Sequence, residues 1–130
     1  QDVCLSLAEK LPEFRGEARL TTWLYRIVAN AARDRLRARD RRAALGAQWH
    51  DMARDAHAGT EAAASARGWI RDAMGVLDAD QSTTLALIVT GGFSHAEAAG
   101  ILGVAEGTVA WRMSEIRKRL ARVAQEKEDA

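Results

Sequence analysis

The stretch from Gly107 to Leu120 combines an apolar stripe with side chains suited to contact nucleic acid. Apolar residues recur at helical spacing and predict a helix held by one face: Val109, Met113, Ile116 and Leu120. We expect the other positions to contact DNA, with Thr108 donating to a phosphate, Ala110, Trp111, Ser114 and Glu115 facing base edges, and Arg112, Arg117 and Arg119 lying against phosphates. This pattern favours a helix that offers its polar face to a major groove.

The residues just before this helix have the spacing of a helix-turn-helix. Ala99 is small enough for two helices to cross closely, and Gly103 supplies the positive φ that a tight turn needs. Val109 then fills the angle between the helices from inside, so the second helix can enter a major groove. The alternative is an ordinary helical hairpin, in which Glu115 would simply pair with Arg119.

A second basic helix has a different character. Seven arginines and two aspartates lie between Arg26 and Arg42. At 100° per residue, five polar residues fall within about 80° of one another: Arg26, Asn30, Arg33, Arg37 and Arg41. The opposite side carries an apolar stripe of Leu20, Leu24, Ile27, Val28 and Ala31. An amide and arginines beside Trp23 suit unstacked bases and a phosphate backbone, whereas the alternative is a solvated surface helix.

Spacing and punctuation predict the helices that must position these residues. In the first part of the chain we expect a helix over residues 1–11 ended by Pro12, and a long helix capped by Thr21 or Thr22. In the second part we expect a helix over 67–78 and one capped by Asp80 or Ser82 and closed by Gly91 and Gly92. A helix capped by Ser94 with Glu97 follows, and the last helix begins at Glu106. We therefore predict an all-α fold of two small helical domains joined by a linker, the second a four-helix domain with the helix-turn-helix.

Composition excludes several classes of protein. The 130 residues carry a formal net charge of +1, so the two basic helices stand out from a nearly neutral chain and suggest two contacts with a polyanion. Cys4 is the single cysteine, which excludes an internal disulfide and indicates a reducing compartment. No apolar run spans a membrane. His50 and His57 are too few for a zinc site, and no nucleophile–base grouping predicts catalysis, so we expect no metal, cofactor or small-molecule substrate.

Two segments together resemble the extracytoplasmic-function (ECF) sigma factors of bacteria, members of the sigma-70 family. "FRGEARLTTWLYRIVANAARDRLRARDRR" is similar to the end of their second region, and "GFSHAEAAGILGVAEGTVAWRMSEIRKRL" to the helix-turn-helix of their fourth. The resemblance implies that residues 1–42 are the C-terminal part of region 2, 43–66 a linker and 67–130 region 4. The first helices of the family would precede Gln1, so we expect the chain to lack its natural beginning.

The resemblance implies a protein that carries RNA polymerase core to promoters and helps to melt them. Region 4 would read the upstream (−35) element as duplex, and region 2 the downstream (−10) element as single strand. The residues implied for the downstream element are Phe14, Arg15, Gly16 and Glu17 in a loop that cradles a flipped base, and Asn30, Arg33 and Arg37 on the long helix. Gln1 and Asp2 would touch the clamp of the largest polymerase subunit, and the polymerase flap would be a further contact.

The family also implies an inhibitory partner. Such proteins act in stress responses in the cytoplasm, and an anti-sigma factor can hold them at the inner membrane. A docking module for such a partner is one alternative function, and the other is a stand-alone helix-turn-helix regulator that binds duplex operators. If the protein reads promoters, Trp111 is expected to be a specificity determinant at the upstream element. If it docks an inhibitor, Trp111 is expected to be a hydrophobic contact for that inhibitor.

Overall fold

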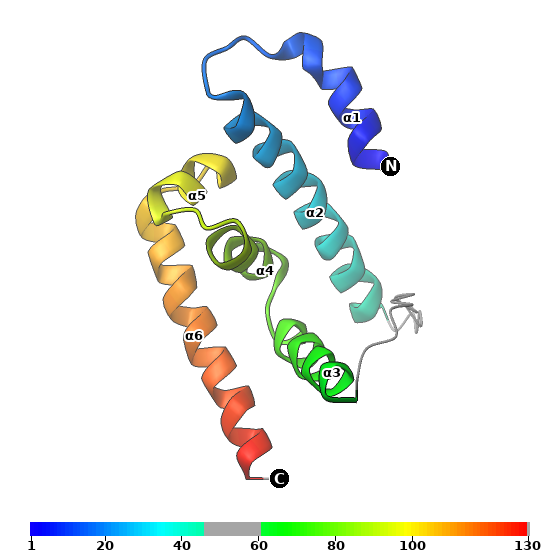
Figure 1. Ribbon diagram of the computed structural model, residues 1–130, viewed down its shortest axis with the longest axis vertical. Coiled ribbons are helices and arrows are strands. Elements are labelled where there is room, and N and C mark those ends of the chain that lie inside the picture. Colours follow the sequence, from blue (N-terminus) through cyan, green and yellow to red (C-terminus); the bar gives the residue numbers. More distant parts are fainter. Residues whose placement is uncertain (46–60, 130) are drawn as a thin grey trace.

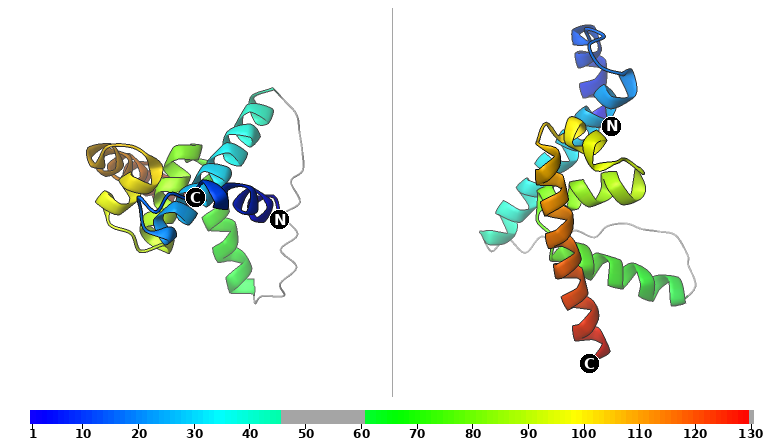
Figure 2. Two further views of the ribbon diagram at one scale, coloured as in Figure 1. Left: turned by 90° about the horizontal axis from the view of Figure 1, so that it is seen from above. Right: turned by 90° about the vertical axis from the view of Figure 1, so that its left-hand side faces the viewer.

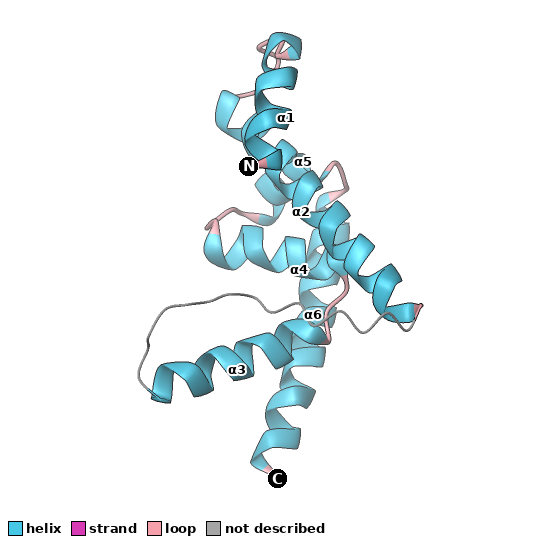
Figure 3. Ribbon diagram, turned by 90° about the vertical axis from the view of Figure 1, so that its right-hand side faces the viewer, coloured by secondary structure: helices cyan, strands magenta, loops and turns pink. Residues whose placement is uncertain are grey.

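The computed structural model describes residues 1–45 and 61–129, and within them every regular element is helical (Figure 3). The elements are α1 (Asp2–Lys10), η1 (Leu11–Glu13), α2 (Leu20–Ala44), α3 (Glu61–Gly75), α4 (Ala79–Leu85), η2 (Ala86–Thr90), α5 (His95–Leu102) and α6 (Glu106–Glu128). The predicted all-α fold is confirmed. His50 and His57 lie outside the described residues, as does most of the predicted linker.

The two longest helices are α2 and α6. α1 folds back along the first half of α2, and α2 then crosses α4 and α5, which in turn pack against α6 (Figures 1 and 2). The second half of the chain is thus a four-helix unit made of α3 to α6. The first half does not stand apart from it, because α2 packs directly against this unit.

The core is built where α2, α5 and α6 meet. One buried cluster consists of Ala29, Leu87, Ala98, Ala99, Ile101, Leu102 and Val109, and a second of Leu77, Met113 and Ile116. Ala98 and Val109 are completely buried, which brings α5 and α6 into close contact. Gly103 ends α5 with φ 68°, in the left-handed region, as a tight turn requires. The predicted helix-turn-helix geometry is therefore present.

Helix starts agree with the sequence only in part. Ser94 caps α5 in a capping box with Glu97, as predicted. The cap of α4 is Asp78, whose side chain accepts from the Gln81 backbone N–H, so the prediction of Asp80 or Ser82 was wrong. α2 begins at Leu20, two or three residues earlier than a threonine cap would allow, and no side chain caps it.

Two helices also differ from their predicted bounds or register. α3 runs from Glu61 to Gly75, so it begins before residue 67 and ends before 78. The end of the α4 segment is a π-helical turn, whose extra residue per turn rotates the following side chains. Within this turn Leu87 is buried, whereas Val89 is 69% exposed.

Replacing Gly103 by Ala is expected to destabilise the chain by about 1 kcal/mol, because an L-residue is strained at positive φ. Gly107→Ala is the matched control: a Cβ there meets nothing within 4 Å and φ is negative, so helix propensity should add about 0.5 kcal/mol of stability. Urea unfolding of both variants measures the difference. Equal effects of the two substitutions would contradict the left-handed turn.

Candidate nucleic-acid interface

One side of α6 is anchored in the core and the other is open. Val109 and Met113 are buried, whereas Trp111 is 62% exposed, with Ala110, Ser114 and Arg117 exposed around it. Thr108 lies in the first turn of the helix and is partly buried. An exposed indole beside a hydroxyl and a guanidinium can offer both apolar contact and hydrogen bonds to a groove.

Glu115 is held as a carboxylate at the edge of this open face. Lys118 Nζ donates to its Oε1 over 2.7 Å, and that hydrogen bond and the lysine charge lower the pKa of Glu115 below its ordinary value. The pairing with Arg119 considered from the sequence is not the one formed, because the Arg119 guanidinium donates to the Val76 carbonyl oxygen over 3.1 Å. Glu115 is therefore an ionised acceptor at this site.

Arg112 and Arg119 do not lie on the open face, although both were predicted to contact phosphates. Arg112 is 13% exposed, and its guanidinium lies 3.5 Å from an Asp80 carboxylate oxygen and 3.5 Å from the Thr84 hydroxyl. Its position beside Met113 turns it toward α4, the inner side of the helix. Of the three arginines expected at phosphates, Arg117 is the one that is exposed.

Part of the polar ridge of α2 is also engaged within the chain. Arg33 Nη2 donates to Asn30 Oδ1 over 2.8 Å, and Arg37 Nη2 lies 3.0 Å from Asp80 Oδ1 on α4. The predicted apolar stripe on the opposite side is only partly covered: Ile27 is buried, but Val28 is 43% exposed. α2 therefore uses the face expected to bind DNA to pack against the second half of the chain.

The loop before α2 stays open. The Phe14 ring packs against Trp23 at 5.3 Å between centroids, and Gly16 turns the chain with φ 73°. Arg15 and Glu17 are exposed beside it. The seven residues implied for the downstream element are thus divided between an accessible loop and a helix face whose arginines pair with Asp80.

The start of α1 borders a shallow hollow between α1 and α2. Gln1 is exposed and lines this hollow with Val3, Ser6 and Val28. Asp2 is the first residue of α1. These two residues sit at an edge of the molecule, away from α6 (Figure 1).

The sequence did not reveal the contacts between the two halves. Tyr25 on α2 meets the Phe93 ring edge-on at 4.7 Å, and Arg26 Nη2 donates to the Gly100 carbonyl oxygen over 2.7 Å. Asp80, expected only as a helix cap, instead forms ion pairs with Arg33, Arg37 and Arg112. Aromatic residues 68 positions apart give no periodic signal, so only the folded chain brings them together.

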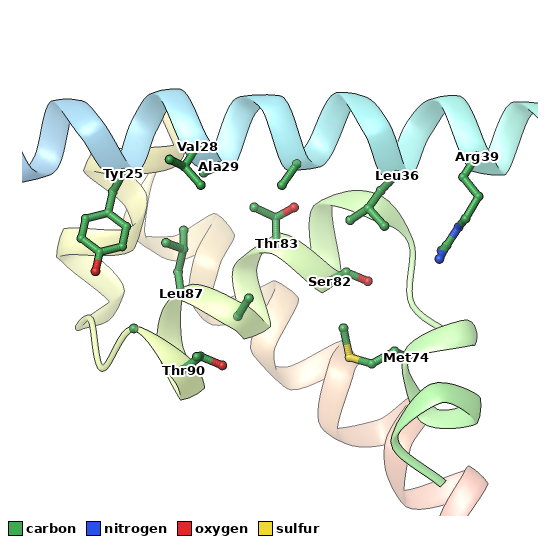
Figure 4. A pocket seen from close by; sticks show the side chains of 13 residues that line it. Tyr25, Val28, Ala29, Leu36, Arg39, Met74, Ser82, Thr83, Leu87 and Thr90 are labelled. Atoms are coloured by element: carbon green, nitrogen blue, oxygen red, sulfur yellow. The ribbon is translucent and has the colours of Figure 1, made fainter. Parts of the chain in front are cut away.

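An apolar groove of about 440 Å³ lies between α2 and the α3–α4 side of the second half (Figure 4). Leu36 projects into it from α2, and Met74 and Leu87 face it from the other wall, with Arg39 at one end. The groove runs along the same junction as the ion pairs. Within residues 1–45 and 61–129 no group of His, Cys, Asp and Glu could hold a metal ion, and no helix is long and apolar enough to span a bilayer.

Comparison with known proteins gives matches to two family models, in different parts of the chain. The model for Sigma-70 region 2 matches residues 1–42, and the model for Sigma-70, region 4 matches residues 67–120. Among curated proteins, the ECF RNA polymerase sigma factor SigM of Mycobacterium tuberculosis, from strains Erdman and H37Rv, is 35% identical over 123 residues. That match covers 95% of this chain and 61% of SigM, so the chain spans about three fifths of these relatives.

A solved structure is similar as well. A chain from the co-crystal structure of the sigma factor RpoE with the anti-sigma factor NepR, from Bartonella quintana, has a TM-score of 0.69 and 28% identity. The match covers 96% of this chain and 78% of that one. Two different sigma-70 regions match in order and leave only the linker and the end unmatched, so the chain belongs to the sigma-70 family, and its similar curated relatives are ECF sigma factors.

Proposed function

We propose that this protein directs RNA polymerase core to specific promoters, reading the upstream element with α6 and the downstream element with the Phe14–Arg19 loop and α2. The single observation that carries the proposal is the helix-turn-helix with an open polar face, on a chain whose other half matches region 2. The chemistry of RNA synthesis would belong to the polymerase, so the protein itself would not be an enzyme.

The open face of α6 supports reading of a duplex. Trp111, Ser114 and Ala110 would meet base edges, and the ionised Glu115 could accept from a cytosine amino group. Arg117 would hold a phosphate and fix the register of the helix in the groove. Arg112 and Arg119 would act indirectly by holding α6 on α4 and α3.

The first half supports contact with a separated strand. Arg15 and Glu17 are exposed around the left-handed Gly16, a loop geometry that leaves the backbone accessible to an unstacked base. Asn30, Arg33 and Arg37 would join this site once the face of α2 is uncovered. Gln1 and Asp2 at the start of α1 would contribute to the contact with the polymerase clamp.

An inhibitory partner is part of the proposal. RpoE of Bartonella quintana was crystallised with an anti-sigma factor, and we propose that an anti-sigma factor likewise binds this protein in the cytoplasm. A stand-alone operator-binding regulator is less well supported, because it gives the region 2 half no role. The deciding test is run-off transcription with the full-length protein and core polymerase on genomic templates, where absence of any promoter-dependent transcript contradicts the proposal.

Trp111→Ala should weaken binding to the upstream duplex element by about tenfold, because apolar contact with the groove is lost. Stability should change by less than about 0.5 kcal/mol, since the side chain is 62% exposed. Fluorescence anisotropy on duplexes selected by the wild-type chain measures the first, and thermal unfolding the second. If Trp111→Ala binds both the selected and the scrambled duplexes as tightly as the wild-type chain does, Trp111 does not contact the bases.

Arg117→Ala and Arg119→Ala form a matched pair on one helix. The first should reduce the slope of log K against log salt by about 1 and leave stability unchanged, as loss of one phosphate contact predicts. The second should lower stability by about 1 kcal/mol, because the hydrogen bond to the Val76 carbonyl is lost. Salt titrations and thermal unfolding of both variants test this division, and interchanged effects would contradict it.

A further inference from the structure

The junction between the two halves engages part of the face of α2 that was expected to bind DNA. Ala29 is 5% exposed and belongs to the same buried cluster as Ala98 and Val109. Tyr25 and Arg26 make the stacking and hydrogen-bond contacts to the α5 region described above. The covered face is therefore a packed junction with both apolar and polar contacts.

Asp80 is the electrostatic centre of this junction. Its carboxylate accepts from Arg37 Nη2 over 3.0 and 3.1 Å, and lies 3.8 Å from Arg33 Nε and 3.5 Å from Arg112 Nη2. Arg33 and Arg37 come from α2, and Arg112 from α6. One carboxylate on α4 thus joins guanidinium groups from both long helices.

The positive charge at this centre is incompletely compensated. Three guanidinium groups share the Asp80 carboxylate, and the buried Nε of Arg33 has no hydrogen-bond partner. Asp78 and Asp40 border the neighbouring hollow, but Arg41 lies there too. Arginines held this way retain affinity for an anion such as phosphate, and their partly exposed ion pairs are weakened by solvent and salt.

We infer that Asp80 is a latch, an internal substitute for a phosphate that keeps the chain closed and engages Arg33 and Arg37 of α2 until nucleic acid competes for these arginines. In the closed chain, Arg33 and Arg37 are engaged by Asp80, and Arg33 also holds Asn30. Opening α2 away from α4 frees Arg33 and Arg37 from Asp80, whereas the Arg33–Asn30 hydrogen bond lies within α2 and does not depend on the junction. The latch itself rests on the contacts within the chain, whereas its effect on DNA binding rests on the proposed function.

Asp80→Asn tests the latch, because it removes the charge and keeps the shape. The cap of α4 stays intact, since Asp78 supplies it. Asp72→Asn is the control: it changes net charge equally, but Asp72 pairs with Lys127 over 3.7 Å and lies on α3, outside the α2 contact. Circular dichroism and thermal unfolding establish that both variants remain folded.

The first readout is conformational and needs no DNA. Spin labels on the exposed natural Cys4 and on Ala121→Cys report the distance between the α1–α2 hairpin and α6. We expect one narrow distance distribution in the parent and in Asp72→Asn, and a longer, broader one in Asp80→Asn. An unchanged distribution in Asp80→Asn overturns the latch, whatever the function of the protein.

The second readout is binding of a random-sequence single-stranded DNA pool, measured by fluorescence anisotropy. Asp80→Asn should bind about fivefold more tightly than Asp72→Asn, the gain expected when a minor open state becomes dominant. Arg37→Ala should also open the chain but show no gain, because it removes a DNA contact together with the latch. A chain that opens without binding more tightly overturns the assignment of the α2 face to DNA and leaves the latch standing.

Discussion

The structure depends on alanines that let three helices approach one another. Ala98 is completely buried, and Ala29 and Ala99 are nearly so, at the point where α2, α5 and α6 meet. α5 has only eight residues and cannot bury a large stripe, so its stability comes from close contact on several sides. Larger side chains at these positions would force the helices apart and with them the turn that sets the angle of α6. The alanine-rich composition is thus the condition for a small domain with a precise helix-turn-helix.

The arginines of the chain fall into distinct groups once their partners are known. Arg119 satisfies a carbonyl at the end of α3, and Arg112 ties α6 to α4, so both stabilise the second half. Arg33 and Arg37 join the two halves through Asp80. Arg117 is exposed and makes none of these contacts. A residue type that suggests nucleic acid at every position therefore also supplies much of the polar packing between helices, because the long side chain can cover apolar surface and still reach a distant acceptor.

The predictability of the fold follows from the range of its interactions. The left-handed Gly103, the Ser94–Glu97 capping box and the buried stripe of α6 are local, and periodicity with turn chemistry was enough to predict them. The inward side of Arg112 and the role of Asp80 depend on residues from other helices, which no spacing rule brings together. The same holds for α2, where a polar ridge packs because Asp80, Phe93 and the Gly100 carbonyl supply partners for it. The π-helical turn at Ala86–Thr90 was not predicted either, and its extra residue changes which side chains face inward.

The unequal exposure of Trp111 and Arg33 implies an order for the two proposed contacts with DNA. In one and the same conformation the indole is open and the guanidinium is covered. On the proposed function, α6 could sample a duplex while Arg33 is still paired within the chain, so that stray single strands elsewhere would not retain the protein. Commitment to a separated strand would follow only where a duplex contact has already raised the local concentration of competing phosphates. If the protein has the proposed function, the junction between α2 and α4 would make the second contact conditional on the first.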